Sequence, residues 1–270
     1  MDSSSGPGTL QYTVLGEFGD LLTDSCDAAL LALLIPAMAS GEAIDVAGAV
    51  SERLYHNLAG PYQRLLQHVI PSLRRVRLRC ANIRSADRRA PGVATGFSAG
   101  VDSYCVLADY YYSPVPAGLK LTHLLFNNVG SHGQGGEHVF NTRFAALEPQ
   151  VERIGLPFVR INSNLDAFYP RQLAFQQTHT PRNVSVALLL QQGIGRFMYA
   201  SAYSYRDVFI GPTCSMAYSD TAAVPLLSTE VLDACSVGSE YTRVEKTLRV
   251  ADIPQSWQTL DICVTPDKAR

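Results

Sequence analysis

Residues 93–104 read V-A-T-G-F-S-A-G-V-D-S-Y, and this stretch decides the fold. The apolar run Val93 to Phe97 predicts a short buried strand. The glycines and serines that follow predict a tight turn. Apolar residues then recur at helical spacing from Ser103 to Tyr112, which predicts a helix. A strand, a tight turn and a helix in this order are typical of α/β proteins with a parallel sheet.

The chain after Pro91 continues to alternate between predicted strands and helices. Further strands are predicted at 119–126, 158–162, 197–200 and 208–211, and further helices at 142–154 and 184–192. We therefore expect an α/β fold with a parallel five-stranded sheet that has helices on both faces.

The first 90 residues have a different pattern. They predict strands at 10–15 and 76–80, a helix from Asp24 or Ser25 to Ala37, and helical spacing over 54–66 that Gly60-Pro61 interrupts. The polar, basic stretch 85–91 predicts a boundary. We expect a small α+β segment at 1–90 and the main domain at 91–270.

Composition excludes several classes of protein. Hydrophobic residues make up 47 % and charged residues 17 % of 270 residues, which is typical of a globular chain. The net charge of -2 gives no general attraction to nucleic acid or to anionic membranes. Seven arginines do gather between Arg74 and Arg89. We interpret them as a solvated face beside the boundary, and RNA is not an expected partner.

The cysteines and the start of the chain indicate the compartment. The six cysteines form no C-x-x-C pair and no disulfide framework, so a zinc ribbon is not expected. Residues 1–8 do not resemble a secretory signal. The apolar run 28–35 stops at Pro36 and is too short to span a bilayer. These features predict a reduced, cytoplasmic protein without membrane contact.

Two motifs overlap in the opening stretch. Residues 96–100 fit G-x-S-x-G, the nucleophile elbow of α/β-hydrolases, in which Ser98 would be the nucleophile. That chemistry needs an acid and a histidine later in the chain. Asp166 and His179 could fill these roles, but His179 is the last histidine and no H-G-G-type element precedes the serine. The hydrolase interpretation stays open as an alternative.

Residues 98–103 instead suit a phosphate-binding loop. A glycine-containing turn at a helix start offers backbone N–H groups to an anion, and Ser98 and Ser103 add hydroxyl donors. Gly100 lets a phosphate approach the backbone. A carboxylate such as Asp102 is useful beside phosphates when it holds Mg²⁺.

The segment Phe97–Ser103 resembles the PP-loop of N-type ATP pyrophosphatases, and the weaker resemblance extends over about residues 91–250. Members cleave ATP between the α and β phosphates to adenylate a substrate. The resemblance implies a sheet of the adenine nucleotide α-hydrolase type, and binding of ATP and Mg²⁺, with Asp102 as the metal ligand and Asp102 and Ser98 as catalytic residues. The implied nucleotide-binding residues in the loop are Gly96, Phe97, Ser98, Ala99, Gly100, Val101, Asp102 and Ser103.

Ala99 departs from the family pattern, which has glycine there. An alanine at a negative φ would cost little conformational free energy, whereas an alanine at a positive φ would strain the loop.

The resemblance implies further site residues, closest to those of 7-cyano-7-deazaguanine synthase-like members and uncharacterised bacterial PP-loop proteins. Phe126, Asn127, Asn128 and Asn183 would bind the nucleotide; Arg182 and Lys246 would be catalytic; Asn162, Asn164, Thr213 and Glu230 would contact the substrate. Each has a plainer interpretation: the asparagines as turn formers, Arg182 as the partner of a structural carboxylate, and Glu230 and Lys246 as surface residues.

The predicted function is an AMP-forming ligase that adenylates a small-molecule carboxylate or amide and transfers it to an amine or ammonia. A sulfur donor is the alternative, with Cys214 as the candidate thiol, on a tRNA or a small molecule. A non-enzymatic nucleotide-binding module is a third hypothesis. His132 and His138 could hold a metal, although loop histidines seldom do. A homodimer is compatible with all of these.

Overall fold

The structure is a computed structural model that describes residues 8–132 and 136–261. Its strands are β1 (Tyr12–Val14), β2 (Ile44–Ser51), β3 (Leu78–Arg84), β4 (Gly92–Gly96), β5 (His123–Asn127), β6 (Phe158–Ser163), β7 (Ile194–Ala200) and β8 (Asp233–Val237). Its α-helices are α1 (Asp27–Ser40), α2 (Glu52–Ala59), α3 (Pro61–Val69), α4 (Val101–Leu107), α5 (Gly136–Ile154), α6 (Phe175–Leu189), α7 (Asp220–Ala223) and α8 (Arg243–Ala251).

The main sheet has six strands in the order β1-β6-β5-β4-β7-β8. Strands β6, β5, β4, β7 and β8 are parallel, and β1 adds an antiparallel edge through Tyr12 and Ser163. The predicted α/β class is confirmed, and the sheet is mixed because β1 joins it. The strand predicted at 208–211 is wrong: these residues lie in an exposed loop, and the fifth parallel strand is β8.

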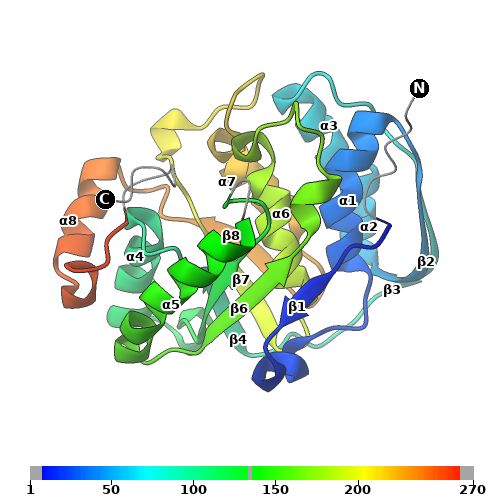
Figure 1. Cartoon of the computed structure of the whole chain (residues 1–270). Helices are drawn as coiled ribbons and strands as arrows, with labels where there is room; N and C mark the ends of the chain where they lie inside the picture. The colour runs from blue at the N-terminus through cyan, green and yellow to red at the C-terminus, as the bar shows by residue number, and fades with distance from the viewer. Residues whose placement is uncertain (1–7, 133–135, 262–270) are drawn as a thin grey trace.

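Helices cover both faces of this sheet (Figure 1). Helices α1 and α6 pack on one face, in a core that continues to α2 and α3. Helices α4, α5 and α8 pack on the other face, around Phe97, Phe126 and Tyr104. Burial of β4 between the two layers explains its continuous apolar sequence.

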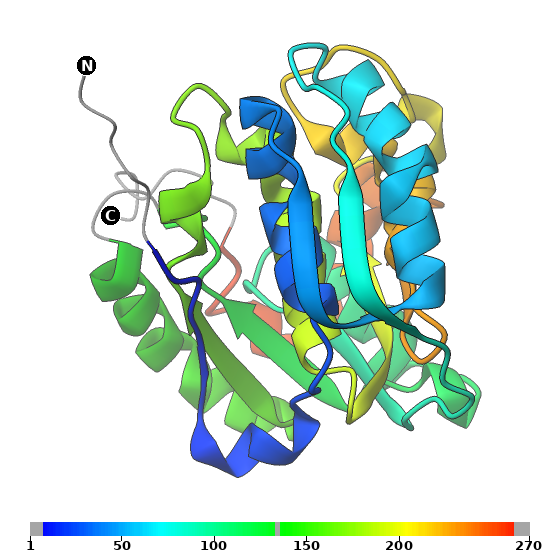
Figure 2. The same ribbon diagram turned by 90° about the vertical axis from the view of Figure 1, so that its right-hand side faces the viewer.

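The N-terminal segment is not separate from the main sheet. Strand β1 pairs with β6, and α1 packs against α6. Only β2 and β3 form a second, two-stranded parallel sheet, which lies outside α1 (Figure 2). Residues from both sides of position 90 therefore share one apolar core.

Local signals explain where several helices begin and end. Gly41 and Gly155 follow α1 and α5 with φ of 81° and 83°, a left-handed conformation that glycine adopts without strain. Gly60 separates α2 from α3, and Pro61 occupies the first position of α3, where no N–H is needed. Helix α6 starts earlier than predicted because it tolerates Pro181 in its second turn.

The strand order reverses at β4. The chain runs outward from β4 to β5 and β6, and then returns to the other side of β4 for β7 and β8. Such a reversal opens a crevice at the carboxyl ends of the strands, where open α/β sheets bind their ligands. The loop after β4 lies at this position.

Candidate functional site

The loop between β4 and α4 is held at both ends and open in the middle. The Phe97 side chain is buried, and its N–H donates to the Leu125 carbonyl at 2.8 Å. Ser98 is exposed, while Ala99 is buried. The Ser103 hydroxyl donates to the Gly100 carbonyl at 2.9 Å, so it closes the first turn of α4. Ser98 is thus the hydroxyl of this loop that faces solvent.

Ala99 has a φ of 59°, and it is the one non-glycine residue with positive φ among residues 8–132 and 136–261. This conformation costs an alanine roughly 1–2 kcal/mol. Burial of its methyl group offsets about 0.8 kcal/mol of that cost. The loop is therefore strained at Ala99, as expected of an alanine at positive φ. Backbone strain of this kind clusters at functional sites.

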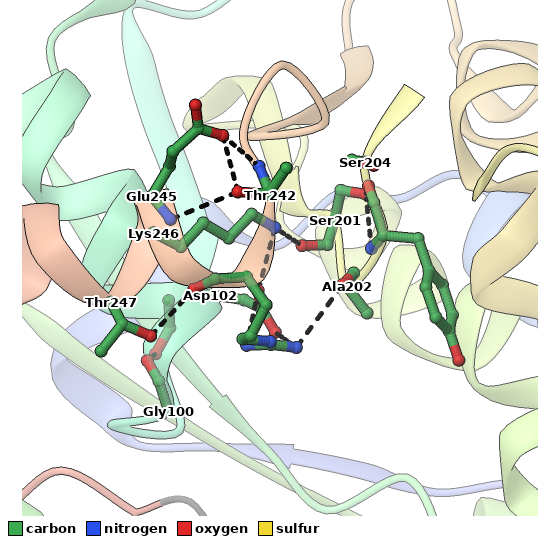
Figure 3. Close-up of polar contacts among 12 residues, drawn as sticks. Gly100, Asp102, Ser201, Ala202, Ser204, Thr242, Glu245, Lys246 and Thr247 are labelled. Atoms are coloured by element: carbon green, nitrogen blue, oxygen red, sulfur yellow. Dashed lines mark hydrogen bonds and ion pairs between the residues drawn. The ribbon is translucent and has the colours of Figure 1, made fainter. Parts of the chain in front are cut away.

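Asp102 lies between two cations from α8 (Figure 3). Lys246 Nζ donates to Asp102 Oδ1 at 2.9 Å. The Arg243 guanidinium bonds both carboxylate oxygens at 3.2 Å each, which is bidentate geometry. The residue Lys246 is 1 % exposed, whereas the Arg243 side chain is 54 % exposed. Lys246 thus depends on Asp102 for charge compensation far more than Arg243 does.

The start of α8 positions both cations. The Thr242 side chain accepts a hydrogen bond from the Glu245 N–H, and the Glu245 carboxylate accepts one from the Thr242 N–H. This capping box fixes the first turn of the helix. Lys246 also donates to the carbonyl of Ser201, directly after β7. The sequence prediction for Lys246 near the loop is in agreement with this geometry, while its alternative as a surface residue is wrong.

Arg143 on α5 is a third cation near the loop, and sequence analysis missed it. Its Nη2 lies 2.5 Å from Asp261 Oδ2, and the Asp261 N–H donates to the Ala99 carbonyl at 2.9 Å. Nothing in the helical pattern around Arg143 distinguishes it from a surface arginine. The position of Arg143 near the loop becomes visible only in the fold, which brings Asp261, 118 residues further along the chain, against the loop.

The carboxyl ends of the strands beside the loop carry open space at one glycine and polar side chains on both sides of it. A Cβ built on Gly96 meets no described atom within 4 Å. On the strand beside it, Asn127 has a buried side-chain oxygen without a hydrogen-bond partner among the described residues. On the other side, Tyr199 follows Met198, the register partner of Thr95. Gly96, Asn127 and Tyr199 thus lie on three neighbouring strands at the carboxyl edge of the sheet.

Helix α6 adds two side chains to the Tyr199 side. His179 Nδ1 lies 2.6 Å from the Tyr199 hydroxyl, and Asn183 Nδ2 donates to the same oxygen at 3.5 Å. Burial, and secondarily the Arg182 charge, lowers the pKa of His179 to about 4. The imidazole is therefore neutral at pH 7. Asn183, predicted to bind the nucleotide, lies on this side of the crevice.

A buried carboxyl group, that of Asp220, contacts α6 at Thr180, the residue after His179. Asp220 Oδ1 accepts a hydrogen bond from the Thr180 hydroxyl at 2.6 Å, and Oδ2 has no partner among the described residues. Burial raises the pKa of Asp220 to about 7, although the Thr180 hydrogen bond lowers it in part. This group makes the stability of the fold depend on pH.

The structure places Arg182 away from the loop. Its guanidinium donates to Asp166 at 2.6 Å and to the Val129 carbonyl at 3.0 Å, and it stacks on Tyr169. The residue is 1 % exposed. These contacts match its alternative interpretation as the partner of a structural carboxylate. They also engage Asp166, which the hydrolase interpretation needed as the triad acid.

The residues predicted on or just after β5 and β6 lie at the carboxyl edge of the sheet. Most of their side chains contact other residues of the protein. Phe126 stacks on Phe140 within the core. Asn128 Nδ2 donates to Asn162 Oδ1 at 2.7 Å, and Asn164 accepts a hydrogen bond from the N–H of Gln11 at 2.8 Å. The three asparagines line a polar cavity of about 560 Å³ beside β1. Of the residues predicted on β5, Asn127 alone has a side-chain polar atom left over for a ligand.

Two predicted substrate residues lie elsewhere. Glu230 lies before β8, at the amino edge of the sheet, where its carboxylate accepts a hydrogen bond from the N–H of Arg53. That edge is opposite the loop, so the predicted substrate role of Glu230 does not fit its position. Thr213 follows β7 and donates its N–H to the Val69 carbonyl of α3.

Other sequence candidates find little support among the described residues. No group of three His, Cys, Asp or Glu side chains there could hold a metal ion. His132 is buried against Phe126 and Phe140, while His138 is exposed. Cys214 is exposed on the loop after β7.

The hydrolase interpretation of Ser98 lacks its partners in the structure. Within the described part of the chain, no histidine forms a hydrogen bond with Ser98, as a nucleophile elbow requires. The strained residue is Ala99 rather than Ser98.

No helix among the described residues is long and apolar enough to cross a membrane. No family model, no curated protein and no solved structure matches the chain significantly.

Proposed function

We propose that the chain is an ATP-dependent, AMP-forming enzyme whose nucleotide binds on the loop 97–103, in a domain of the adenine nucleotide α-hydrolase type. A carboxylate or amide oxygen of a small-molecule substrate attacks the α-phosphorus, and pyrophosphate leaves. An amine or ammonia then displaces AMP. The observation that carries the proposal is the convergence of Asp102, Lys246 and Arg243 beside a loop at the reversal of strand order.

The charges in this cluster suit a metal-bound polyphosphate. Two cations and one carboxylate leave a net positive charge in this cluster, while Arg143, near the same loop, is paired with Asp261. Phosphate oxygens are good acceptors for both Arg243 and Lys246. The side chains would release Asp102 as they engage the phosphates.

Asp102 fits a magnesium ion under these conditions. Mg²⁺ commonly uses one or two protein carboxylates together with phosphate oxygens, so a single aspartate suffices. When bound, the ion would screen the phosphate charge and polarise the α-phosphate. The protein residues would contribute orientation and charge stabilisation, without a covalent nucleophile.

The crevice beside the loop supports a position for the rest of the nucleotide. Gly96 borders open space, and the Asn127 oxygen could accept a hydrogen bond from an exocyclic amine. The neutral His179–Tyr199 pair would border the nucleotide without adding charge to the site.

The test is a screen of carboxylates and amides, each with amines or ammonia, for pyrophosphate release from ATP. The proposal expects pyrophosphate and AMP in equal amounts, dependent on Mg²⁺ and on the substrate. Release of orthophosphate and ADP, or covalent labelling of Ser98 by a fluorophosphonate, would contradict it.

A further inference from the structure

A second cavity lies at the amino edge of the sheet, opposite the loop. Its volume is about 780 Å³, within the range of small-molecule sites. Its walls include Pro91 before β4, Gln192 before β7 and Val231 before β8. The start of α1 and the end of β3 complete it. It therefore lies where β2 and β3 meet the main sheet.

The arginine run of the sequence contributes three members to this cavity. Arg84, Arg88 and Arg89 line it, against one exposed carboxylate, that of Asp24. The nearby Asp27 is buried, and it accepts hydrogen bonds from Ser25, Ser51 and Gln191 at 2.6–2.9 Å. Its oxygens are thus satisfied from within the protein. The wall carries an excess of positive charge.

These guanidinium groups are available to a ligand. Arg88 forms no ion pair or hydrogen bond with the rest of the described chain. The Arg84–Asp24 pair at 3.1 Å is exposed, and such pairs are weak. Arg89 lies 3.7 Å from Asp233, which has a closer partner in Arg196 at 3.2 Å. An anion could therefore engage all three arginines without loss of a strong contact.

The remainder of the arginine run does not extend this surface. Arg79, on β3, forms a bidentate pair with Asp45, and Arg75 donates to the Ala59 carbonyl. A nucleic-acid strand would need continuous positive charge along β3. Along β3 that charge is interrupted at the Arg79–Asp45 pair, whereas three arginines gather in the cavity at the end of the strand.

We propose that this cavity binds a small polyanion, a phosphorylated or polycarboxylate molecule with at least two negative charges. Guanidinium groups bind both kinds of oxyanion bidentately. The Ser85 hydroxyl and the Gln192 amide lie on the same wall and add neutral donors. The proposal is independent of the chemistry at the loop, since the two sites lie at opposite edges of the sheet.

The test is calorimetric titration of the full chain at low salt with inorganic pyrophosphate and, separately, with citrate. The variants are Arg88→Gln, which removes an unpaired charge, and Ser85→Glu, which adds a negative charge to an exposed position of the wall. Arg77→Gln is the matched control, because Arg77 is exposed and in the same run but outside the cavity. Circular dichroism verifies folding.

We expect Arg88→Gln and Ser85→Glu to bind roughly five- to tenfold more weakly than wild type, and Arg77→Gln to bind normally. Tighter binding of pyrophosphate than of citrate identifies a phosphorylated ligand, and the reverse a polycarboxylate. Binding at the loop is recognised because Gly96→Val removes it and Arg88→Gln does not. The proposal is overturned by wild-type binding of neither anion, by unchanged affinity in both cavity variants, or by equal losses in Arg77→Gln and Arg88→Gln.

Discussion

Lys246 is the residue on which the candidate site depends most, because its ammonium group is buried and Asp102 is its acidic partner. Loss of one member of a buried ion pair leaves an uncompensated charge, which is more costly than loss of the whole pair. Asp102 is itself a quarter exposed, so solvent moderates this cost.

The first prediction concerns this pair. Asp102→Asn should lower the free energy of unfolding by about 2–3 kcal/mol, because Lys246 then stays buried beside a neutral amide. The double variant Asp102→Asn/Lys246→Met should recover at least half of that loss. Urea denaturation of the wild type, both single variants and the double variant measures the coupling. Additive losses would show that the two side chains do not interact.

The second prediction concerns Asp220, whose folded-state pKa of about 7 lies above its unfolded value near 4. The folded protein therefore holds a proton that the unfolded chain has lost between these pH values. The contribution of Asp220 to stability is present below pH 4 and is lost as the pH rises to 7. Histidines with a lowered pKa, such as His179, act in the opposite direction over the same range.

The effect of the Asp220 carboxyl group is isolated by comparing the free energy of unfolding of Asp220→Asn with that of the wild type at each pH. The stability of Asp220→Asn relative to wild type should rise by up to roughly 4 kcal/mol between pH 4 and pH 8. Chemical denaturation at four pH values across this range measures it. A difference that stays constant with pH would mean that folding does not raise the pKa of Asp220.

At the scale of elements, strong local signals were sufficient for much of the fold. The β4–loop–α4 unit, the glycine ends of α1 and α5, and the break at Gly60-Pro61 all follow from short-range chemistry. Strands β2 and β8 were missed because their sequences mix small, polar and apolar residues, and pairing with neighbours stabilises them. The apolar run 208–211 was misassigned because its side chains are exposed.

The site was predicted less completely than the fold. The loop was found because its residues are contiguous, and Lys246 was named only because the family resemblance implied it. Arg143 was missed because an arginine on a helix surface has no distinguishing local pattern, and Arg243, although it lies three residues before Lys246, was not named as a site residue. Glu230 was misplaced because β8 was not predicted, so the sequence did not show that this loop precedes a strand and lies at the amino edge of the sheet.

The third prediction concerns the start of α8. Thr242→Ala removes the capping box and should cost about 1 kcal/mol of stability. Because Arg243 and Lys246 follow this cap directly, nucleotide binding should weaken as well. Thr247→Ala is the matched control, since Thr247 is exposed on the same helix and, among the described residues, its hydroxyl bonds only the Arg243 carbonyl. Equal effects of the two substitutions on stability would contradict the role of the cap.

At the scale of the whole molecule, β4 joins two charged regions. Its carboxyl end leads into the loop with Asp102, Lys246 and Arg243, and its amino end begins at the arginine-lined cavity. The first 90 residues contribute to both the core and the cavity, through α1 and through β3. The molecule is therefore a continuous unit with charged groups at both edges of its sheet.

The most direct test is calorimetric binding of α,β-methylene ATP with Mg²⁺ to the wild type, to Gly96→Val and to Gly118→Val. Neither glycine has a described atom near its Cβ position, so both variants should fold. Gly96 is the last residue of β4, directly before the loop, whereas Gly118 lies in an exposed turn away from it. The proposed function predicts binding by the wild type and by Gly118→Val, and loss of binding in Gly96→Val. Absence of binding to wild type, or equal binding by all three proteins, would contradict a nucleotide site on this loop.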